Sequence, residues 1–290
     1  MTDHRLAADV ELLWDTRCVL GEGLILDRAA AALWFIDIKR PRLFCCGLED
    51  GRRRTWQLPA QVSAIAFPPA GWTAPRAAEI TLLSVGAQGF AWLLVDGESV
   101  AISAIAHPEA GLPGNRFNDG KTGPDGRFYA GTMDDSETAA TGVLYALDRS
   151  GAVTRIDDGY WVTNGPAFAP GGSTLYENDS ALRRTYAFDL TAKGEVKGKR
   201  LLRQFSETEG YPDGMIADAA GNLWIAMWDG ARLQRLAPNG ISTGHIVVPV
   251  RRPTSCVVLD GGGLAFTSAS IGLGDTGAAD GGLYLAHPRG

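Results

Sequence analysis

Four oxygen-bearing side chains occupy an equivalent position in separate segments of the chain. They are Glu22, Asn118, Asn164 and Asp213, and each stands ten or eleven residues before a short apolar run. Carboxylate and amide oxygens are the ligands that hard divalent cations prefer, and a carboxylate can also accept a proton during hydrolysis. If the segments repeat one structural unit around a ring, equivalent positions converge on the ring axis. The spacing therefore predicts one polar site assembled from distant parts of the chain.

The apolar runs recur at a regular interval. They begin at Leu33, Leu82, Phe128, Leu175, Leu223 and Leu264, which are 49, 46, 47, 48 and 41 residues apart. An interval of this size accommodates four strands and their turns. Hairpin sequences such as Pro-Gly-Gly-Ser at 170–173 supply residues that tolerate positive φ. The sequence therefore predicts an all-β fold, a six-bladed β-propeller.

The sixth unit is one strand short. It contains the strand-like runs Cys256–Leu259, Leu264–Ser268 and Gly282–Ala286, whereas a complete unit has four. The run Val10–Trp14 precedes the first complete unit, and pairing it with the sixth would close the ring and remove an unpaired edge. Unit two is irregular because of a Pro- and Ala-rich insertion at 67–80. A ring closed by its own terminus has no internal boundary, so residues 1–290 are expected to form a single domain.

Composition and charge narrow the partners. The chain has 290 residues, of which 45% are hydrophobic and 37 are glycine, and its net charge is −6. Many glycines fit many tight turns, and an acidic balance argues against nucleic acid or an anionic membrane as partner. The N-terminal residues lack the apolar core of a signal peptide, and no apolar stretch is long enough to span a membrane. We expect a cytoplasmic protein, a monomer, that acts on a small molecule.

Cysteine and histidine offer no metal site. Cys18, Cys45, Cys46 and Cys256 form no C-x-x-C pair and are expected to be free thiols. The four histidines are His4, His107, His245 and His287, and they form no H-x-x-x-H pair. A His-rich zinc site is therefore not expected, and any metal must be held by oxygen.

Two motifs suggest other chemistry and fail on context. Residues 240–244 match G-x-S-x-G, but a nucleophilic serine needs a strand before the motif and a helix after it, whereas Ser242 lies between two expected strands. Residues 114–122 resemble a phosphate loop, but the glycine spacing is one residue too long and a strand hairpin follows. Neither motif is expected to be catalytic.

The polar residues of the repeat also have simpler explanations. Asp213 lies in Pro-Asp-Gly, which is a common turn sequence, Glu22 lies between two glycines, and Asn164 precedes Gly-Pro. Each could therefore be an ordinary loop residue. Pro124-Asp125-Gly126, which is an ordinary turn, lies only three residues before its strand, whereas Asp213 lies ten before, in register with the others.

Several ordered motifs span most of the chain. They are Gly-Glu-Gly at 21–23, Asn-Arg-Phe-Asn-Asp-Gly at 115–120, Gly-Thr-Met at 131–133, Thr-Asn-Gly-Pro at 163–166 and Tyr-Pro-Asp-Gly at 211–214. Together they resemble the signatures of the SMP-30/gluconolactonase/regucalcin family. The resemblance implies a six-bladed propeller that hydrolyses sugar lactones with one divalent cation, held at Glu22, Asn164 and Asp213. It also implies that Arg116 and Asn118 contact the substrate.

The sequence departs from the family pattern at two places. Leu24 replaces the usual proline after Gly-Glu-Gly, and Val257-Val258-Leu259 replaces a Phe-Gly-Gly run in unit six, where it is expected near the axis. Acidic residues after Met133 contact the substrate in some relatives, and Asp134 and Asp135 are the possible counterparts here.

The expected activity is metal-dependent hydrolysis of a five- or six-membered lactone of a sugar acid. The cation could be Ca²⁺, Mg²⁺, Mn²⁺, Fe²⁺ or Zn²⁺, because two carboxylates and an amide oxygen suit all of them. Asp213, or water held between it and the metal, would be the base. Two alternatives remain open at this point: an esterase or phosphotriesterase of the same architecture, and a non-catalytic calcium-binding or ligand-sensing propeller.

Overall fold

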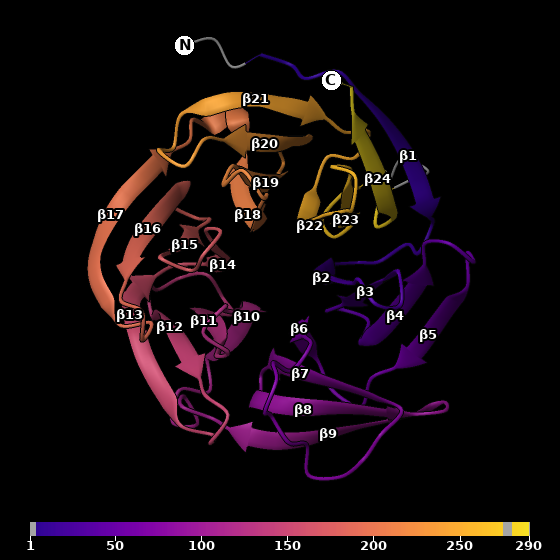
Figure 1. Ribbon diagram of the computed structural model, residues 1–290, viewed down its shortest axis with the longest axis vertical. Coiled ribbons are helices and arrows are strands. Elements are labelled where there is room, and N and C mark those ends of the chain that lie inside the picture. The colour runs from indigo at the N-terminus through magenta and orange to yellow at the C-terminus, as the bar shows by residue number, and fades with distance from the viewer. Residues whose placement is uncertain (1–3, 275–279, 290) are drawn as a thin grey trace.

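Six antiparallel sheets of four strands each surround a central axis in the computed structural model, which describes residues 4–274 and 280–289 (Figure 1). Within these residues the only helix is a single 3₁₀ turn, η1 (Glu207–Glu209). This architecture is an all-β six-bladed propeller and confirms the prediction made from the repeat. The described residues include no helix of the length and hydropathy needed to span a membrane.

The first three blades run from the innermost to the outermost strand in chain order. Blade one contains β2 (Gly21–Asp27), β3 (Ala32–Asp37), β4 (Arg42–Gly47) and β5 (Arg53–Gln57). Blade two contains β6 (Val62–Ala66), β7 (Ile80–Gly86), β8 (Gly89–Asp96) and β9 (Ser99–Ala106). Blade three contains β10 (Asn115–Thr122), β11 (Phe128–Asp134), β12 (Gly142–Leu147) and β13 (Val153–Tyr160).

The last three blades follow the same order. Blade four contains β14 (Thr163–Phe168), β15 (Thr174–Asp179), β16 (Arg184–Leu190) and β17 (Val196–Gln204). Blade five contains β18 (Tyr211–Ala217), β19 (Leu223–Trp228), β20 (Arg232–Leu236) and β21 (Ser242–Val247). Blade six contains β22 (Pro253–Val258), β23 (Leu264–Ser268), β24 (Leu283–Pro288) and, as its outer strand, β1 (Ala8–Trp14). The apolar runs of the repeat form the second strand of each blade.

The N-terminal strand closes the ring. β1 pairs antiparallel with β24 in a register that sets Val10 opposite Ala286. At the end of β1, Trp14 packs edge-on against Phe35 and Phe44 of blade one, with ring centroids 6.1 and 5.5 Å apart. β1 therefore completes blade six and also contacts blade one. This confirms the closure predicted from the missing strand of unit six.

Burial explains why the middle strands are continuously apolar. All seven residues of β11 are buried, because adjacent blades cover both faces of this sheet, whereas seven of the nine residues of the outer strand β17 are exposed. The cores lie between neighbouring blades; one joins Phe90 of blade two to Phe117 and Phe128 of blade three. All four cysteines are free, as expected.

Each innermost strand carries a β-bulge that re-aims its side chains. Regular pairing breaks after Glu22 in β2, at Asn118 in β10, after Asn164 in β14 and at Asp213 in β18. Gly165 follows one of these positions with φ +62°, and a Cβ there would lie 2.7 Å from the carbonyl oxygen of Asp213. Only glycine therefore lets β14 approach β18 so closely.

The bulges of blades two and six carry hydroxyl side chains instead. Ser63 lies in the bulge of β6, where its hydroxyl donates to the Val85 carbonyl oxygen at 3.2 Å. Thr254 and Ser255 lie in the bulge of β22. Acidic and amide side chains thus occur in only four of the six bulges, so the polar groups at the axis are gathered on blades one, three, four and five.

Candidate functional site

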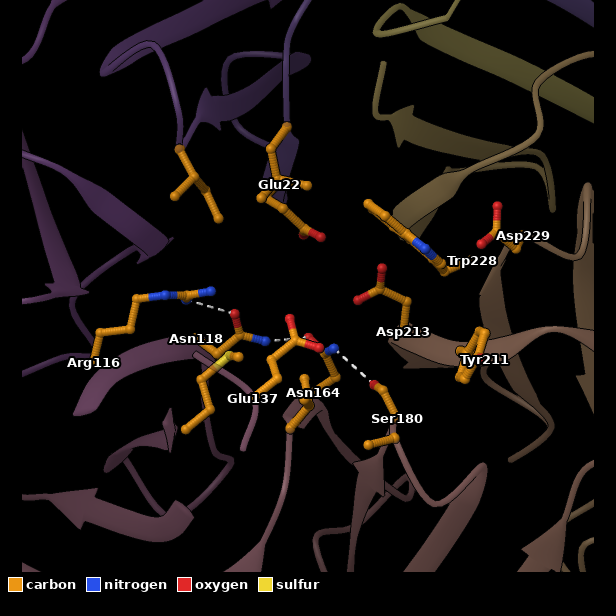
Figure 2. Close-up of a pocket in the computed structure, with 15 residues that line it drawn as sticks. Glu22, Arg116, Asn118, Glu137, Asn164, Ser180, Tyr211, Asp213, Trp228 and Asp229 are labelled. Atoms are coloured by element: carbon orange, nitrogen blue, oxygen red, sulfur yellow. Dashed lines mark hydrogen bonds between the residues drawn. The ribbon is translucent and has the colours of Figure 1, made fainter. Parts of the chain in front are cut away.

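The five site residues predicted from the sequence line one cavity. Its volume is about 510 Å³, and it lies among the innermost strands, which surround the centre of the ring in Figure 1. The residues are Glu22, Arg116, Asn118, Asn164 and Asp213, which the chain brings together from four blades (Figure 2). The convergence follows from the bulges, which place equivalent residues of successive blades at the same depth.

Two carboxylates face each other across this cavity without a cationic partner. Glu22 is 7% exposed and Asp213 is 5% exposed. Burial is the main cause that raises the pKa of each carboxyl well above its usual value, and the nearby negative charges of Asp213 and Asp119 add to the rise at Glu22. Neither carboxylate forms an ion pair within residues 4–274 and 280–289. The Arg116 guanidinium offsets part of the rise at Glu22, but two buried carboxylates that share one cavity still favour a cation between them.

An amide network fixes the orientation of Asn118. The Arg116 guanidinium is purely a donor, and its Nη1 donates to Asn118 Oδ1 at 2.7 Å. The other end of the same amide, Nδ2, donates to the Thr163 carbonyl oxygen at 2.8 Å and to Asn164 Oδ1 at 2.9 Å. A flipped Asn118 would set donors against donors, so only one orientation satisfies its neighbours.

Ser180 fixes Asn164 in the same way. The Ser180 hydroxyl donates to the Pro212 carbonyl oxygen at 2.6 Å and accepts from Asn164 Nδ2 at 2.8 Å. Since its proton is committed to a carbonyl, this hydroxyl can only accept from Asn164. The amide nitrogen therefore faces Ser180, and Oδ1 faces the opposite way, toward Asn118. This role could not be found from the sequence, because Ser180 lies just beyond the strand that faces Asn164 and belongs to no motif.

The donor set suits a hard or borderline divalent cation. Glu22, Asp213 and the Asn164 amide oxygen are the groups that could hold it, while no three His, Cys, Asp or Glu side chains of the described residues are close enough together to do so. A site in this cavity would then include the Asn164 amide oxygen, which accepts one hydrogen bond from Asn118 Nδ2 and keeps a second lone pair.

The acidic residues that follow Met133, Asp134 and Asp135, contact other parts of the protein. Asp134 accepts hydrogen bonds from Ser136, Thr138 and Ala139, which hold its pKa far below the usual value, and so it caps the loop after β11. Asp135 forms an ion pair with Arg116, with Oδ1 2.5 Å from Nε. Neither is among the residues that line the cavity. Asp135 therefore reaches the cavity only through Arg116, and Asp134 stabilises the loop.

Glu137 lines the cavity in their place. It has φ +56°, a left-handed conformation, and its side chain is one of those that line the cavity in Figure 2. Sequence spacing could not find it, because the hydrogen bonds to Asp134 determine which loop residue points inward.

The side of the cavity away from Arg116 is formed by aromatic residues. Tyr211 and Trp228, which are paired across β18 and β19, lie there beside Asp213 (Figure 2). Aliphatic side chains complete the lining at Leu20, Ile38, Met133 and Val162. Arg116 and Asn118 therefore form a polar side of the cavity, and the two rings lie opposite them beside the carboxylates of Asp213 and Asp229.

The remaining sequence features lie away from the cavity. Ser242 begins the outermost strand of blade five, and no helix follows it. Residues 115–122 form strand β10 rather than a phosphate loop. Val257 lies in β22, the innermost strand of blade six, as expected, but it packs with Leu24 in one apolar core and does not line the cavity.

Comparison with known proteins agrees with this geometry. A family model described as SMP-30/Gluconolactonase/LRE-like region matches residues 20–270. The chain belongs to this family. L-arabinolactonase of Azospirillum brasilense is 33% identical over 292 residues, which cover 98% of this chain and 93% of the relative. Pentonolactonase of Haloferax volcanii is 31% identical over 93% of this chain and 91% of its own.

A solved structure has the same arrangement of blades. It is described as a calcium-binding protein, regucalcin, from Agrobacterium tumefaciens, and it aligns with a TM-score of 0.86 at 26% identity, over 100% of this chain and 97% of that one. Membership of the SMP-30/gluconolactonase family therefore rests on sequence and on fold together.

Proposed function

We propose that this protein is an aldonolactonase, which opens the cyclic ester of a sugar acid to the free acid with the help of one divalent cation. The observation that supports this most is the convergence of Glu22, Asn164 and Asp213 on one cavity. Its relatives include proteins named as an arabinolactonase and a pentonolactonase, which favours a lactone of a short sugar acid as the substrate.

Glu22, Asn164 and Asp213 would hold the cation. When bound, it supplies a positive charge that polarises the lactone carbonyl and lowers the energy of the oxyanion that forms on attack. The protein contributes a ligand set fixed in advance: Gly23 N–H donates to Glu22 Oε2 at 3.2 Å, and Ser180 fixes the Asn164 amide.

The polar side of the cavity would bind the hydroxyl groups of the sugar. Arg116 uses Nε and Nη1 for contacts within the protein, and its Nη2 donates to no group in the described part of the chain, so two N–H donors remain for a ligand. Asn118 Oδ1 keeps a second lone pair, and the Glu137 carboxylate is an acceptor. This mixture of donors and acceptors suits a polyol, since each hydroxyl can both donate and accept.

Asp213 would accept the proton from the attacking water. Water attacks the carbonyl carbon of the lactone and gives a proton to the Asp213 carboxylate. The bond between that carbon and the ring oxygen then breaks, and the ring oxygen takes up a proton and leaves as a hydroxyl. A bound cation would favour the ionised form of Asp213, which is the form that can accept the proton. A water molecule held beside Asp213 would serve the same role by relay.

A pH-indicator assay with a panel of lactones tests this proposal. We expect acid release from sugar lactones, its loss after the metal is stripped, and its return when single cations are added back. Acid release from no lactone with any cation, or full activity after complete removal of metal, would refute it.

A calcium-binding protein without catalytic activity is the second candidate, because the similar structure from Agrobacterium is described as calcium-binding. Calcium binding to the stripped protein, measured by calorimetry and combined with no acid release in the same preparation, would favour this alternative.

A further inference from the structure

On the side of the cavity away from Arg116, two aromatic side chains are each held by an arginine. Tyr211 and Trp228 each carry an arginine guanidinium stacked over the ring, at 4.2 Å from the Tyr211 centroid for Arg183 and 4.7 Å from the Trp228 centroid for Arg252. One face of each ring is therefore covered by a planar cation. Because both side chains line the cavity, part of the ring surface that the arginine leaves uncovered can contact a ligand.

Each arginine is itself fixed by further hydrogen bonds. Arg183 Nη2 donates to the hydroxyl of Tyr211 at 2.8 Å, so the same residue restrains both the face and the tip of the phenol. Arg252 donates from Nε and Nη2 to the Asp229 carboxylate at 2.9 and 3.3 Å, and from Nη1 to the Ile271 carbonyl oxygen. These contacts limit the rotation of both rings before any ligand arrives.

Packing of the protein core does not account for these rings. Neither Tyr211 nor Trp228 belongs to the buried apolar clusters between the blades, and both are only half-buried. The interaction that would use a flat, rigid aromatic surface beside Asp213 is therefore one with a ligand.

We propose that Tyr211 and Trp228 form a subsite for the C–H face of the lactone ring, and that this subsite selects among epimers. The inference rests on the proposed lactonase function and adds the basis of its stereochemical preference. A sugar lactone has hydroxyls that can reach Arg116, Asn118 and Glu137 on the polar side, and C–H groups that can pack on the aromatic faces. Asp229 also lines this side, but its carboxylate already contacts Arg251 and Arg252. An epimer with a hydroxyl directed at the face of a ring would bury that hydroxyl against carbon, which lowers the rate by about 5- to 150-fold.

The test measures kcat/KM for the four L-pentono-1,4-lactones, with arabino, ribo, xylo and lyxo configurations. The spread is the ratio of kcat/KM between the best and the worst epimer, and in the wild type we expect this ratio to be large. Trp228→Ala should lower kcat/KM for the best epimer by about ten-fold and narrow the spread by at least about five-fold, while the affinity for the cation stays unchanged. Trp228→Phe, which keeps an aromatic face, should retain most of the spread.

Trp72→Ala is the matched control. Trp72 is also half-buried and donates from Nε1 to the Gly126 carbonyl oxygen at 2.9 Å, but it does not line the cavity. It should leave the spread unchanged. An unchanged spread in Trp228→Ala, or an equal loss in Trp72→Ala, would overturn the subsite. If Trp228→Ala does not fold, Trp228→Phe provides the test, because it keeps an aromatic ring. Equal kcat/KM values of Trp228→Phe for all four epimers would then overturn the subsite. Lack of hydrolysis of any epimer by the wild type would instead refute the lactonase function itself.

Discussion

Replacement of Ser180 by alanine should weaken metal binding although Ser180 is not one of the proposed ligands. The hydroxyl accepts from Asn164 Nδ2 at 2.8 Å and donates to the Pro212 carbonyl oxygen at 2.6 Å, and Ser180 is only 9% exposed. Without it, the buried Nδ2 group loses its partner, and the amide oxygen loses the contact that turns it away from Ser180.

The size of the effect follows from these contacts. A buried polar group left without a hydrogen bond costs about 1–3 kcal/mol, and each 1.4 kcal/mol corresponds to a factor of ten in an equilibrium constant. If that cost falls on the arrangement in which Asn164 Oδ1 faces the cation, the dissociation constant should rise by about 5- to 150-fold. The overall fold should survive, because the alanine methyl group fills most of the same space.

Isothermal titration of the metal-stripped protein with Ca²⁺ and Mn²⁺ measures this change. Ser63→Ala is the matched control, because Ser63 is a buried hydroxyl in the equivalent bulge of blade two that donates only to Val85 and does not line the cavity. We expect unchanged affinity for Ser63→Ala. Equal affinities of Ser180→Ala and the wild type would refute the reasoning that Ser180 orients a metal ligand.

Three further predictions concern the substrate, the ring closure and a buried acid. Arg116→Ala should lower kcat/KM for the best lactone by about 5- to 150-fold, because one or two hydrogen bonds to the substrate are lost, while the affinity for the cation stays unchanged. Steady-state kinetics and metal titration measure the two quantities, and an unchanged kcat/KM would contradict the prediction. Deletion of residues 1–15 removes β1 and exposes the edge of β24, so the melting temperature should fall by many degrees; a fall of one or two degrees would contradict the closure. Glu177 is fully buried, neither of its carboxylate oxygens has a hydrogen-bond partner, and burial raises its pKa well above the usual value. The folded protein thus binds a proton that the unfolded chain releases near pH 4.3, so the stability of the wild type should fall by about 1.4 kcal/mol per pH unit between the unfolded and folded pKa values. Glu177→Gln removes this loss, so the free energy of unfolding of the variant, measured with urea at pH 5, 6 and 7, should exceed that of the wild type by an amount that grows with pH. A difference that stays constant with pH would mean that the carboxyl is not protonated in the folded protein.

The sequence determined the fold through local patterns. Strand periodicity, turn residues and an interval near 47 residues are properties of short segments, and each blade repeats them independently. The short sixth unit determined the role of residues 10–14 for a similar reason, because an unpaired edge needs a partner and only one strand was left to supply it.

The residues that line the cavity were also predictable in part. Glu22, Asn164 and Asp213 share a register, and a ring of equivalent blades must bring equivalent positions to its axis. This reasoning needs only the symmetry of the fold and no knowledge of how neighbouring blades contact each other.

Contacts between blades decided the rest. The Asn118–Asn164 hydrogen bond joins residues 46 apart in sequence, and the Ser180 hydroxyl reaches a carbonyl 32 residues away. No local pattern specifies such pairs, because they depend on how one sheet twists against the next. Glu137 entered the cavity, and Asp134 and Asp135 did not, because hydrogen bonds within one loop determined which side chain turned inward. Tyr211 and Trp228 are likewise ordinary strand residues in the sequence, and they became the wall of a cavity only when arginines from neighbouring blades stacked on their outer faces.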